Sequence, residues 1–145
     1  MPVTVETLTE VDDEIVEAFD RLLPQLSQTA NRLDREALAR LAATESTTVL
    51  MARSDGKIVG TLSLVMFAIP SGFRARVEDV VVDDSARGHG IGAALIEEAK
   101  VRAGVAGART LDLTSRASRS AANRLYERLG FHARESRVYR LAPTD

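Results

Sequence analysis

The sequence predicts an α/β (α+β) fold in which a mixed sheet has helices on both faces. Apolar residues recur with the two-residue period of strands in some segments and with the helical period in others. These segments follow in the order strand, two helices, three strands, helix, strand, helix and one or two strands, with no internal repeat or linker. The 145 residues are 45% hydrophobic and 28% charged, which suits one core, so we expect a single domain over residues 1–145.

The composition excludes several classes of protein. Nineteen Lys and Arg against 21 Asp and Glu give a net charge of -2, which argues against a nucleic-acid binder. The absence of Cys excludes disulfides, thiolate metal sites and a Cys nucleophile. Because His89 and His132 are isolated and no Cys is present, we expect no metal. The longest apolar run, residues 64–69, is far below the roughly 18 residues of a membrane helix. With no secretory signal visible, we expect a cytoplasmic protein without a membrane partner.

The first segments of the chain predict a strand and two helices. Residues 3–8 alternate apolar and polar, as a half-buried strand does. Thr9 can cap the helix that follows, and Pro24 is expected to end it. A second short helix is expected after Asp34.

Three strands are expected next. Residues 47–53 and 57–67 are rich in β-formers and are separated by Asp55 and Gly56, a pair that favours a hairpin turn. Residues 74–82 form the third strand of this group.

The second half of the chain begins with a polar loop over residues 83–92. Gly130 is the expected residue just past a helix end. The elements expected after the loop are a helix to about residue 103, a strand at 110–114, a helix at 120–129, and one or two closing strands within 131–141.

The loop before the third helix has the composition of an anion site. Its last six residues are Arg87, Gly88, His89, Gly90, Ile91 and Gly92. Glycines allow positive φ and close backbone approach, and the first amides of a helix have no partners within it. Arg87 adds a positive charge suited to phosphate oxygens. A diphosphate would use all three features, provided that Asp83 and Asp84 point away from it.

Two other interpretations of this loop exist. It can be a glycine-rich turn that only joins a strand to a helix. It can also be a dinucleotide fingerprint, because Gly88, Gly90 and Ala93 fit G-x-G-x-x-A and Asp112 could be the acidic ribose partner. Only 53 residues follow Gly92, however, which is little chain for the larger parallel sheet of that fold.

Two motifs resemble those of the GNAT-type N-acetyltransferases. Residues 77–82 read Val-Glu-Asp-Val-Val-Val, and after them Arg87, Gly90 and Gly92 fill the three fixed positions of [RQ]-x-x-G-x-[GA]. Residues 122–131 are similar to the later A-x-x-L-Y-x-x-x-G-F pattern of the family. The resemblance implies the GNAT acyl-CoA N-acyltransferase fold, whose mixed sheet is mostly antiparallel.

The resemblance also implies acetyl-CoA as cosubstrate, with the amides of residues 87–92 on the CoA diphosphate. Val80, Val81 and Val82 would pair with the pantetheine arm, and an amide near Val80 would polarise the thioester carbonyl. Asn123 would contact the CoA arm, and Tyr126 would be the general acid that protonates the departing thiolate. Asn123 and Tyr126 are three residues apart, so a helix places them on one face. Without the motif, the expectation for Tyr126 would be an aromatic ring packed in the core, with its hydroxyl hydrogen-bonded locally.

Glu78 is the candidate general base for the acceptor amine. A carboxylate with an ordinary pKa near 4.3 is a weak base unless burial raises that pKa. The alternative is a strand carboxylate paired with Arg74 or Arg76. Strand alternation places Asp79 on the face opposite to Glu78.

The sequence leaves the acceptor open as a primary amine of a small molecule or of a peptide. The Val-Glu-Asp-Val stretch is similar to that of amino-sugar-phosphate acetyltransferases, but also to that of uncharacterised bacterial relatives, so it does not single out an amino-sugar acceptor. The resemblance leads us to expect a protein of bacterial type. A different class is a non-catalytic acyl-CoA sensor or partner module. Family members often form homodimers, although the sequence identifies no interface.

Overall fold

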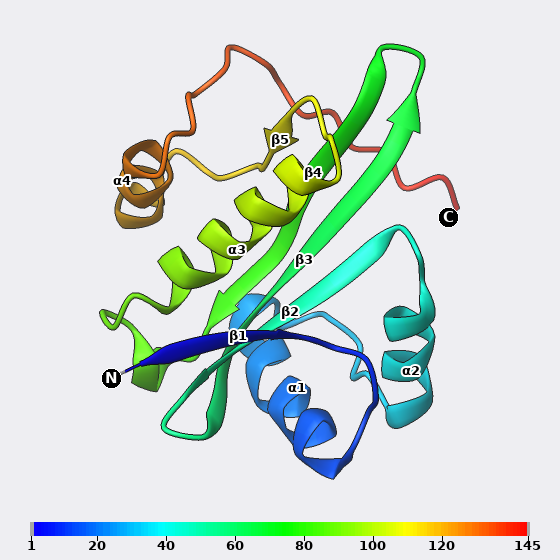
Figure 1. Ribbon diagram of the computed structural model, residues 1–145, viewed down its shortest axis with the longest axis vertical. Helices are drawn as coiled ribbons and strands as arrows, with labels where there is room; N and C mark the ends of the chain where they lie inside the picture. The colour runs from blue at the N-terminus through cyan, green and yellow to red at the C-terminus, as the bar shows by residue number, and fades with distance from the viewer. Residues whose placement is uncertain (1, 145) are drawn as a thin grey trace. The chain divides into compact units, whose positions relative to one another are not determined.

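The computed structural model describes residues 2–144, and the elements of Figure 1 lie within that range. The chain divides into two compact units, the first ending at Thr114 and the second starting at Ser115. The first unit contains β1 (Val3–Thr7), α1 (Asp13–Leu26), α2 (Arg35–Ala43), β2 (Thr47–Ser54), β3 (Lys57–Ile69), β4 (Gly72–Val82), the 3₁₀ turn η1 (Asp84–Ala86), α3 (Ile91–Val105) and β5 (Leu111–Asp112). The second unit contains α4 (Ser120–Arg128).

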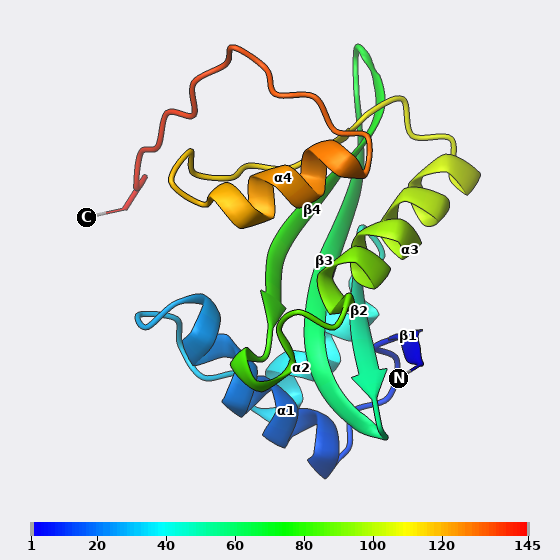
Figure 2. The same ribbon diagram turned by 90° about the vertical axis from the view of Figure 1, so that its left-hand side faces the viewer.

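The five strands form one sheet in the order β1-β2-β3-β4-β5. The first four strands pair antiparallel, and β5 pairs parallel to β4. Figures 1 and 2 show α1 and α2 on one face of this sheet and α3 on the other. The prediction of a mixed, mostly antiparallel sheet with helices on both faces is therefore confirmed.

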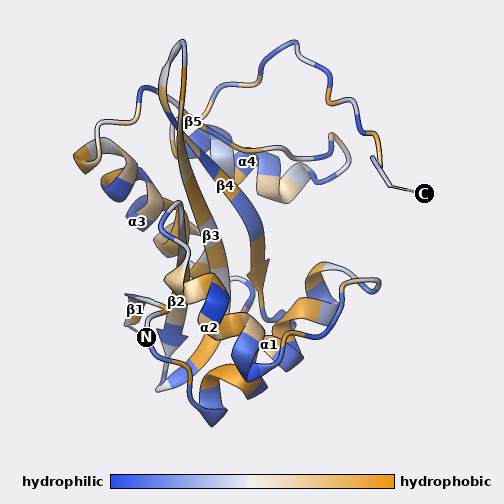
Figure 3. Ribbon diagram, turned by 90° about the vertical axis from the view of Figure 1, so that its right-hand side faces the viewer, coloured by the Kyte–Doolittle hydropathy of each residue, from blue (hydrophilic) through white to orange (hydrophobic). Residues whose placement is uncertain are grey.

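The core under α1 and α2 follows from the helical spacing of apolar residues in α1. Ile15, Ala18, Phe19 and Leu22 recur every three or four residues and are all buried. They pack against buried residues of the sheet, and Figure 3 shows hydrophobic colour along parts of α1 and of the strands. The strand, loop and second-helix residues of this cluster are Leu8, Leu38, Val49, Met51, Ile58 and Val81.

A glycine in β3 lets α3 approach the other face of the sheet closely. A Cβ at Gly60 would lie 2.9 Å from Ile91 Cγ2, 3.2 Å from Leu95 Cδ1 and 3.2 Å from the carbonyl oxygen of Val81. Both side chains are fully buried, so neither can move aside freely. This contact fixes the first turn of α3, which follows the glycine-rich loop.

The Gly60→Ala substitution is expected to lower the free energy of unfolding by about 1–3 kcal/mol, because it overpacks the α3–β3 contact. Gly104→Ala is the matched control, since Gly104 is helical and an added Cβ there meets nothing within 4 Å. We expect the free energy of unfolding of that control to rise by about 0.5–1 kcal/mol. Urea denaturation of both variants measures the difference, and equal stabilities would contradict the close contact.

Two helix boundaries differ from the sequence prediction. Asp12, not Thr9, is the N-cap of α1, and its carboxylate accepts a hydrogen bond of 2.9 Å from the amide of Ile15. Pro24 does not end this helix, which continues to Leu26. A proline removes one helix hydrogen bond but does not prevent packing, and Leu22 on the preceding turn is fully buried. The Asp34 N-cap of α2 is confirmed.

The closing strands expected within residues 131–141 are wrong. The structure has no strand there, and the side chains from residue 132 to residue 144 are exposed. A strand needs a partner backbone, and the described part of the second unit holds no other strand for it. The strand expected at 110–114 is also shorter, because only Leu111 and Asp112 pair with β4.

Candidate active site

The segment of β4 with Glu78 and Val80 is irregular. Ser63 of β3 is opposite Glu78, and Thr61 is opposite Val81, so two steps on β3 face three on β4. This is a β-bulge, and Asp79 within it has a φ of 50°. The bulge interrupts the strand alternation from which Asp79 and Glu78 were expected on opposite faces, and both residues are exposed.

The bulge changes what the strand backbone offers to a ligand. Asp79 and Val80 have no Cα partner on β3 in the described register, whereas Val81 and Val82 resume the pairing. Backbone groups outside the ladder need another partner. An extended thioester arm beside Val80 could supply one, as the sequence motif implies.

The glycine loop has the geometry of an anion site. Gly88 and Gly90 have φ values of 83° and 75°, and a Cβ at either would meet nothing within 4 Å. The space beside both residues is therefore open. Glycine is needed there for the left-handed backbone rather than for close packing.

The amides after these glycines point out of the helix end. Gly90 is the N-cap of α3, with no side-chain capping bond, and its carbonyl accepts from the amide of Ala94 at 3.0 Å. The amides of Ile91, Gly92 and Ala93 thus lack partners within the helix. They lie at the positive end of the helix dipole, so the residues present fit a diphosphate.

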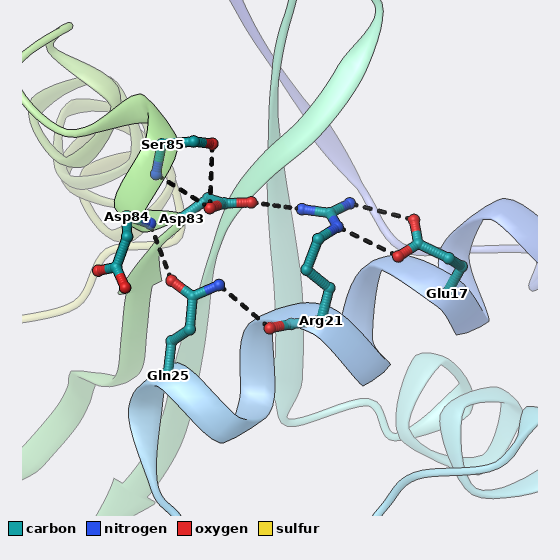
Figure 4. A network of polar contacts seen from close by, with 6 residues as sticks. All are labelled: Glu17, Arg21, Gln25, Asp83, Asp84 and Ser85. Atoms are coloured by element: carbon teal, nitrogen blue, oxygen red, sulfur yellow. Dashed lines mark hydrogen bonds and ion pairs between the residues drawn. The ribbon is translucent and has the colours of Figure 1, made fainter.

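Asp83 sits buried at the start of this loop and binds groups on two sides, as Figure 4 shows. Its Oδ2 accepts from Arg21 Nη1 of α1 at 2.7 Å. Its Oδ1 accepts from the amide and the hydroxyl of Ser85, each at 3.1 Å. The hydrogen bond from the backbone amide of Ser85, together with Arg21, holds the pKa of Asp83 at about 2, although burial alone would raise it. The Asp83 carboxylate is thus bound by Arg21 and by Ser85 at the start of the loop.

We expect Asp83→Asn to destabilise the protein at neutral pH but not in strong acid. A depressed pKa in the folded state stabilises the fold above the ordinary carboxyl pKa, and this contribution is lost as the pH falls from about 4 through about 2. The difference at pH 7 should be about 2 kcal/mol. Urea unfolding at several pH values measures it, with Asp20→Asn as a control, because the Asp20–Arg32 pair is more exposed. A difference that persists at pH 2 would contradict the linkage.

Arg87 and His89 make contacts inside the loop. Arg87 Nη2 lies 2.9 Å from Asp84 Oδ1, and both side chains are mostly exposed. Asp84 therefore partly neutralises the cationic residue of the loop, although an exposed pair of this kind is worth at most about 1 kcal/mol. His89 Nδ1 lies 3.1 Å from the carbonyl oxygen of Ala86 and folds the loop back on η1.

Glu78 is paired with an arginine, which is the alternative that the sequence left open. Arg76 Nε donates to Glu78 Oε2 at 3.1 Å, and the same guanidinium donates to Thr114 Oγ1 at 3.0 Å. The Glu78 side chain is 50% exposed, so water reaches the carboxylate. A proton could therefore pass to it through water.

The candidate residues of the second unit lie on α4. Asn123 accepts from Ser115 Oγ at 2.6 Å and donates to the carbonyl of Arg116 at 3.0 Å, so it holds the turn before the helix. The Tyr126 ring meets Phe131 edge-on, with centroids 6.1 Å apart. Burial raises the pKa of Tyr126, opposed by Arg119, so its hydroxyl stays protonated at neutral pH.

The predicted residues therefore fall into two groups. Glu78, the valines of β4 and the loop over residues 87–92 belong to the first unit, where β4 leads directly into the loop. Asn123 and Tyr126 belong to the second unit and share the helix α4. Sequence reasoning missed Arg21 and Gln25 of α1, because no motif links them to a loop about 60 residues further on.

Residues 2–144, the part of the chain that the structure describes, contain neither a cluster of metal ligands nor a membrane-spanning helix. Among them, no three His, Cys, Asp or Glu side chains gather in a way that could hold a metal ion. Within the same range, no helix has the length and apolar character needed to cross a membrane.

Comparison with known proteins agrees with these features. Residues 9–131 match the Acetyltransferase (GNAT) family. A crystal structure of an acetyltransferase from Trypanosoma brucei is 28% identical, with 97% of this chain and 99% of that chain covered and a TM-score of 0.79. Ribosomal-protein-alanine N-acetyltransferase from Brucella melitensis biovar Abortus 2308 is 26% identical, with 97% and 100% covered and a TM-score of 0.75.

A third structure shares the fold alone. It is an aminoglycoside acetyltransferase from an uncultured soil metagenomic sample, 22% identical, with 99% of this chain and 97% of that chain covered and a TM-score of 0.84. A search of curated proteins found no match. The family match spans the loop, the bulge and α4, and this chain belongs to the GNAT family of acetyltransferases.

Proposed function

We propose that the chain transfers an acetyl group from acetyl-CoA to a primary amine of a small molecule or a peptide, by direct attack in a ternary complex. The observation that carries the proposal is that three features follow one another along the chain. They are the bulge in β4, the left-handed Gly88 and Gly90 with open space beside them, and the first amides of α3, which lack partners within the helix. One anion site next to irregular strand backbone suits a ligand in which a diphosphate is joined to an amide-containing arm.

The reaction needs one bond made, one broken and two protons moved. The amine nitrogen bonds to the thioester carbonyl carbon, and the bond from that carbon to sulfur breaks. The amide near Val80 would polarise the carbonyl, and Glu78 would accept the proton of the amine through water. Tyr126 would give a proton to the sulfur, and Asn123 would contact the CoA arm.

The acceptor class rests on chemistry and on the names of similar proteins. Those names cover a ribosomal-protein alanine and an aminoglycoside, and both kinds of acceptor carry an amine. A cytoplasmic location, a single-domain organisation, a bacterial type and homodimerisation stay predictions from the sequence.

A screen of acetyl transfer tests the proposal. Purified protein is mixed with acetyl-CoA and, in turn, amino sugars, polyamines, amino acids and peptides, and the released thiol is measured. We expect release with one acceptor class and none without an amine. Tight CoA binding with no turnover across the whole panel would favour the alternative, an acyl-CoA sensor. Binding of NAD and not of CoA would favour the dinucleotide site.

Glu78→Gln is expected to lower kcat/KM by about 10²-fold at neutral pH, because the amide cannot accept the amine proton. The matched control is Asp79→Asn, which removes the neighbouring exposed carboxylate and keeps a residue type that tolerates positive φ. Steady-state kinetics with the acceptor from the screen measure both variants. If kcat/KM falls equally in both variants, the negative charge around the bulge matters and Glu78 is not the base.

A further inference from the structure

We infer that Arg21 and Gln25 of α1 are positioning residues for the diphosphate-binding loop, and that they raise the affinity for CoA without touching it. The inference rests on the proposed function, because it concerns the loop that would hold the CoA diphosphate. It assigns to α1 a role in cosubstrate binding that no motif in the sequence indicates. Figure 4 shows the contacts that carry it.

The first contact is between Arg21 and Asp83. Arg21 Nη1 lies 2.7 Å from Asp83 Oδ2, and the Asp83 side chain is only 8% exposed. On its other side Arg21 binds Glu17 of the same helix, at 3.1 Å and 3.3 Å. Both neighbours are carboxylates, so the guanidinium charge is already neutralised. Arg21 therefore holds the loop and is not itself free to bind a phosphate.

The second contact is between Gln25 and the next loop residue. Gln25 Oε1 accepts from the backbone amide of Asp84 at 2.8 Å. The Gln25 amide nitrogen donates to the carbonyl of Arg21 at 3.1 Å, which fixes its orientation. Two residues one helical turn apart thus bind two successive loop residues, one through a side chain and one through the backbone.

These contacts reach the glycines through a short chain of hydrogen bonds. Asp83 Oδ1 caps η1 by accepting from Ser85, and the amide of Asp83 donates to the carbonyl of Val59 at 2.8 Å. The last residue of η1, Ala86, accepts from His89 between the two glycines. The loop before Gly90 has no regular ladder of its own. Its backbone conformation therefore depends on the contacts from α1. Without them, the loop would have to become ordered when the ligand binds, and this would lower the affinity.

The experiment compares binding of CoA with binding of pantetheine, which lacks the diphosphate and the phosphorylated adenosine of CoA. CoA and pantetheine are titrated calorimetrically into the wild type and into Arg21→Ala, Arg21→Lys, Gln25→Ala and Arg32→Ala. Arg32 is the matched control, because it makes a two-bonded ion pair with Asp20 of α1 at 2.8 Å and 2.9 Å and contacts no loop residue among the described contacts. Circular dichroism and urea unfolding check each fold.

We expect the Kd for CoA to rise about tenfold in Arg21→Ala and Gln25→Ala, with partial recovery in Arg21→Lys. The Kd for pantetheine should stay the same in all variants, and Arg32→Ala should bind both ligands like the wild type. Unchanged CoA binding in the two alanine variants overturns the inference. An equal loss for both ligands overturns it too, because it would show only a structural role. If Arg21→Ala does not fold, Gln25→Ala decides. Failure of the wild type to bind CoA would instead overturn the proposed function.

Discussion

The Gly90→Glu variant is expected to lose CoA binding by at least about 10²-fold while remaining folded. Gly90 is the N-cap of α3, and the space beside its Cα is open. A glutamate there would place a carboxylate where the diphosphate is proposed to lie. Two like charges about 4 Å apart repel by about 4 kcal/mol at a protein surface, which corresponds to roughly 10³-fold in affinity. A thermal shift with CoA, followed by calorimetry, measures the loss.

Gly107→Glu is the matched control for this variant. Gly107 has a φ of 83°, close to the 75° of Gly90, and an added Cβ there also meets nothing within 4 Å. Both variants therefore carry the same backbone strain, of order 1–3 kcal/mol, and the same added charge. Gly107 follows α3 at its other end, away from the helix N-terminus. Normal CoA binding in Gly90→Glu would refute the loop assignment, and loss in both variants would trace the effect to strain.

The elements that could be predicted were those whose signal is local. The glycine loop is predictable because glycines at a strand–helix junction allow the left-handed backbone found at Gly88 and Gly90. The second helix was predicted with its Asp34 cap because an acidic cap binds an amide three residues ahead. The Asp12 cap follows the same rule, but Thr9 offers an equal signal, and only packing separates the two residues.

The features that could not be predicted depend on residues far apart in the chain. The bulge at Asp79 comes from the register of β3 on β4, which no pattern within β4 reveals, and Asp is merely a residue that tolerates its φ. The Arg21–Asp83 pair joins residues 62 positions apart. The alternation within residues 131–141 predicted a strand, but alternation alone supplies no pairing partner. The burial of the candidate side chains also depends on how distant segments pack, so it could not be predicted from the sequence.

Tyr126→Phe is expected to lower kcat by about 10²–10⁴-fold and to leave CoA affinity and stability nearly unchanged. Phenylalanine keeps the ring and its edge-on contact with Phe131, and it removes only the hydroxyl. The control is Tyr139→Phe, which removes the hydroxyl of the other tyrosine, whose side chain is 86% exposed. Steady-state kinetics with the acceptor from the screen compare the two. Turnover unaffected by Tyr126→Phe would exclude the general-acid role.

The pKa of Tyr126 decides how this acid can act. A phenol near pKa 10 that gives its proton to a thiolate near 8.5 goes uphill by roughly 2 kcal/mol, and burial raises the Tyr126 pKa further, opposed by Arg119. Complete transfer to the free thiolate is therefore unfavourable, and the hydroxyl is expected to donate to the sulfur in the transition state, while the carbon–sulfur bond breaks. The same shift keeps the acid form present at high pH. The rate of the wild type should thus rise as the amine loses its proton and should show no loss from Tyr126 below about pH 10. A fall between pH 7 and 9 that disappears in Tyr126→Phe would mean a lowered pKa and would contradict this account.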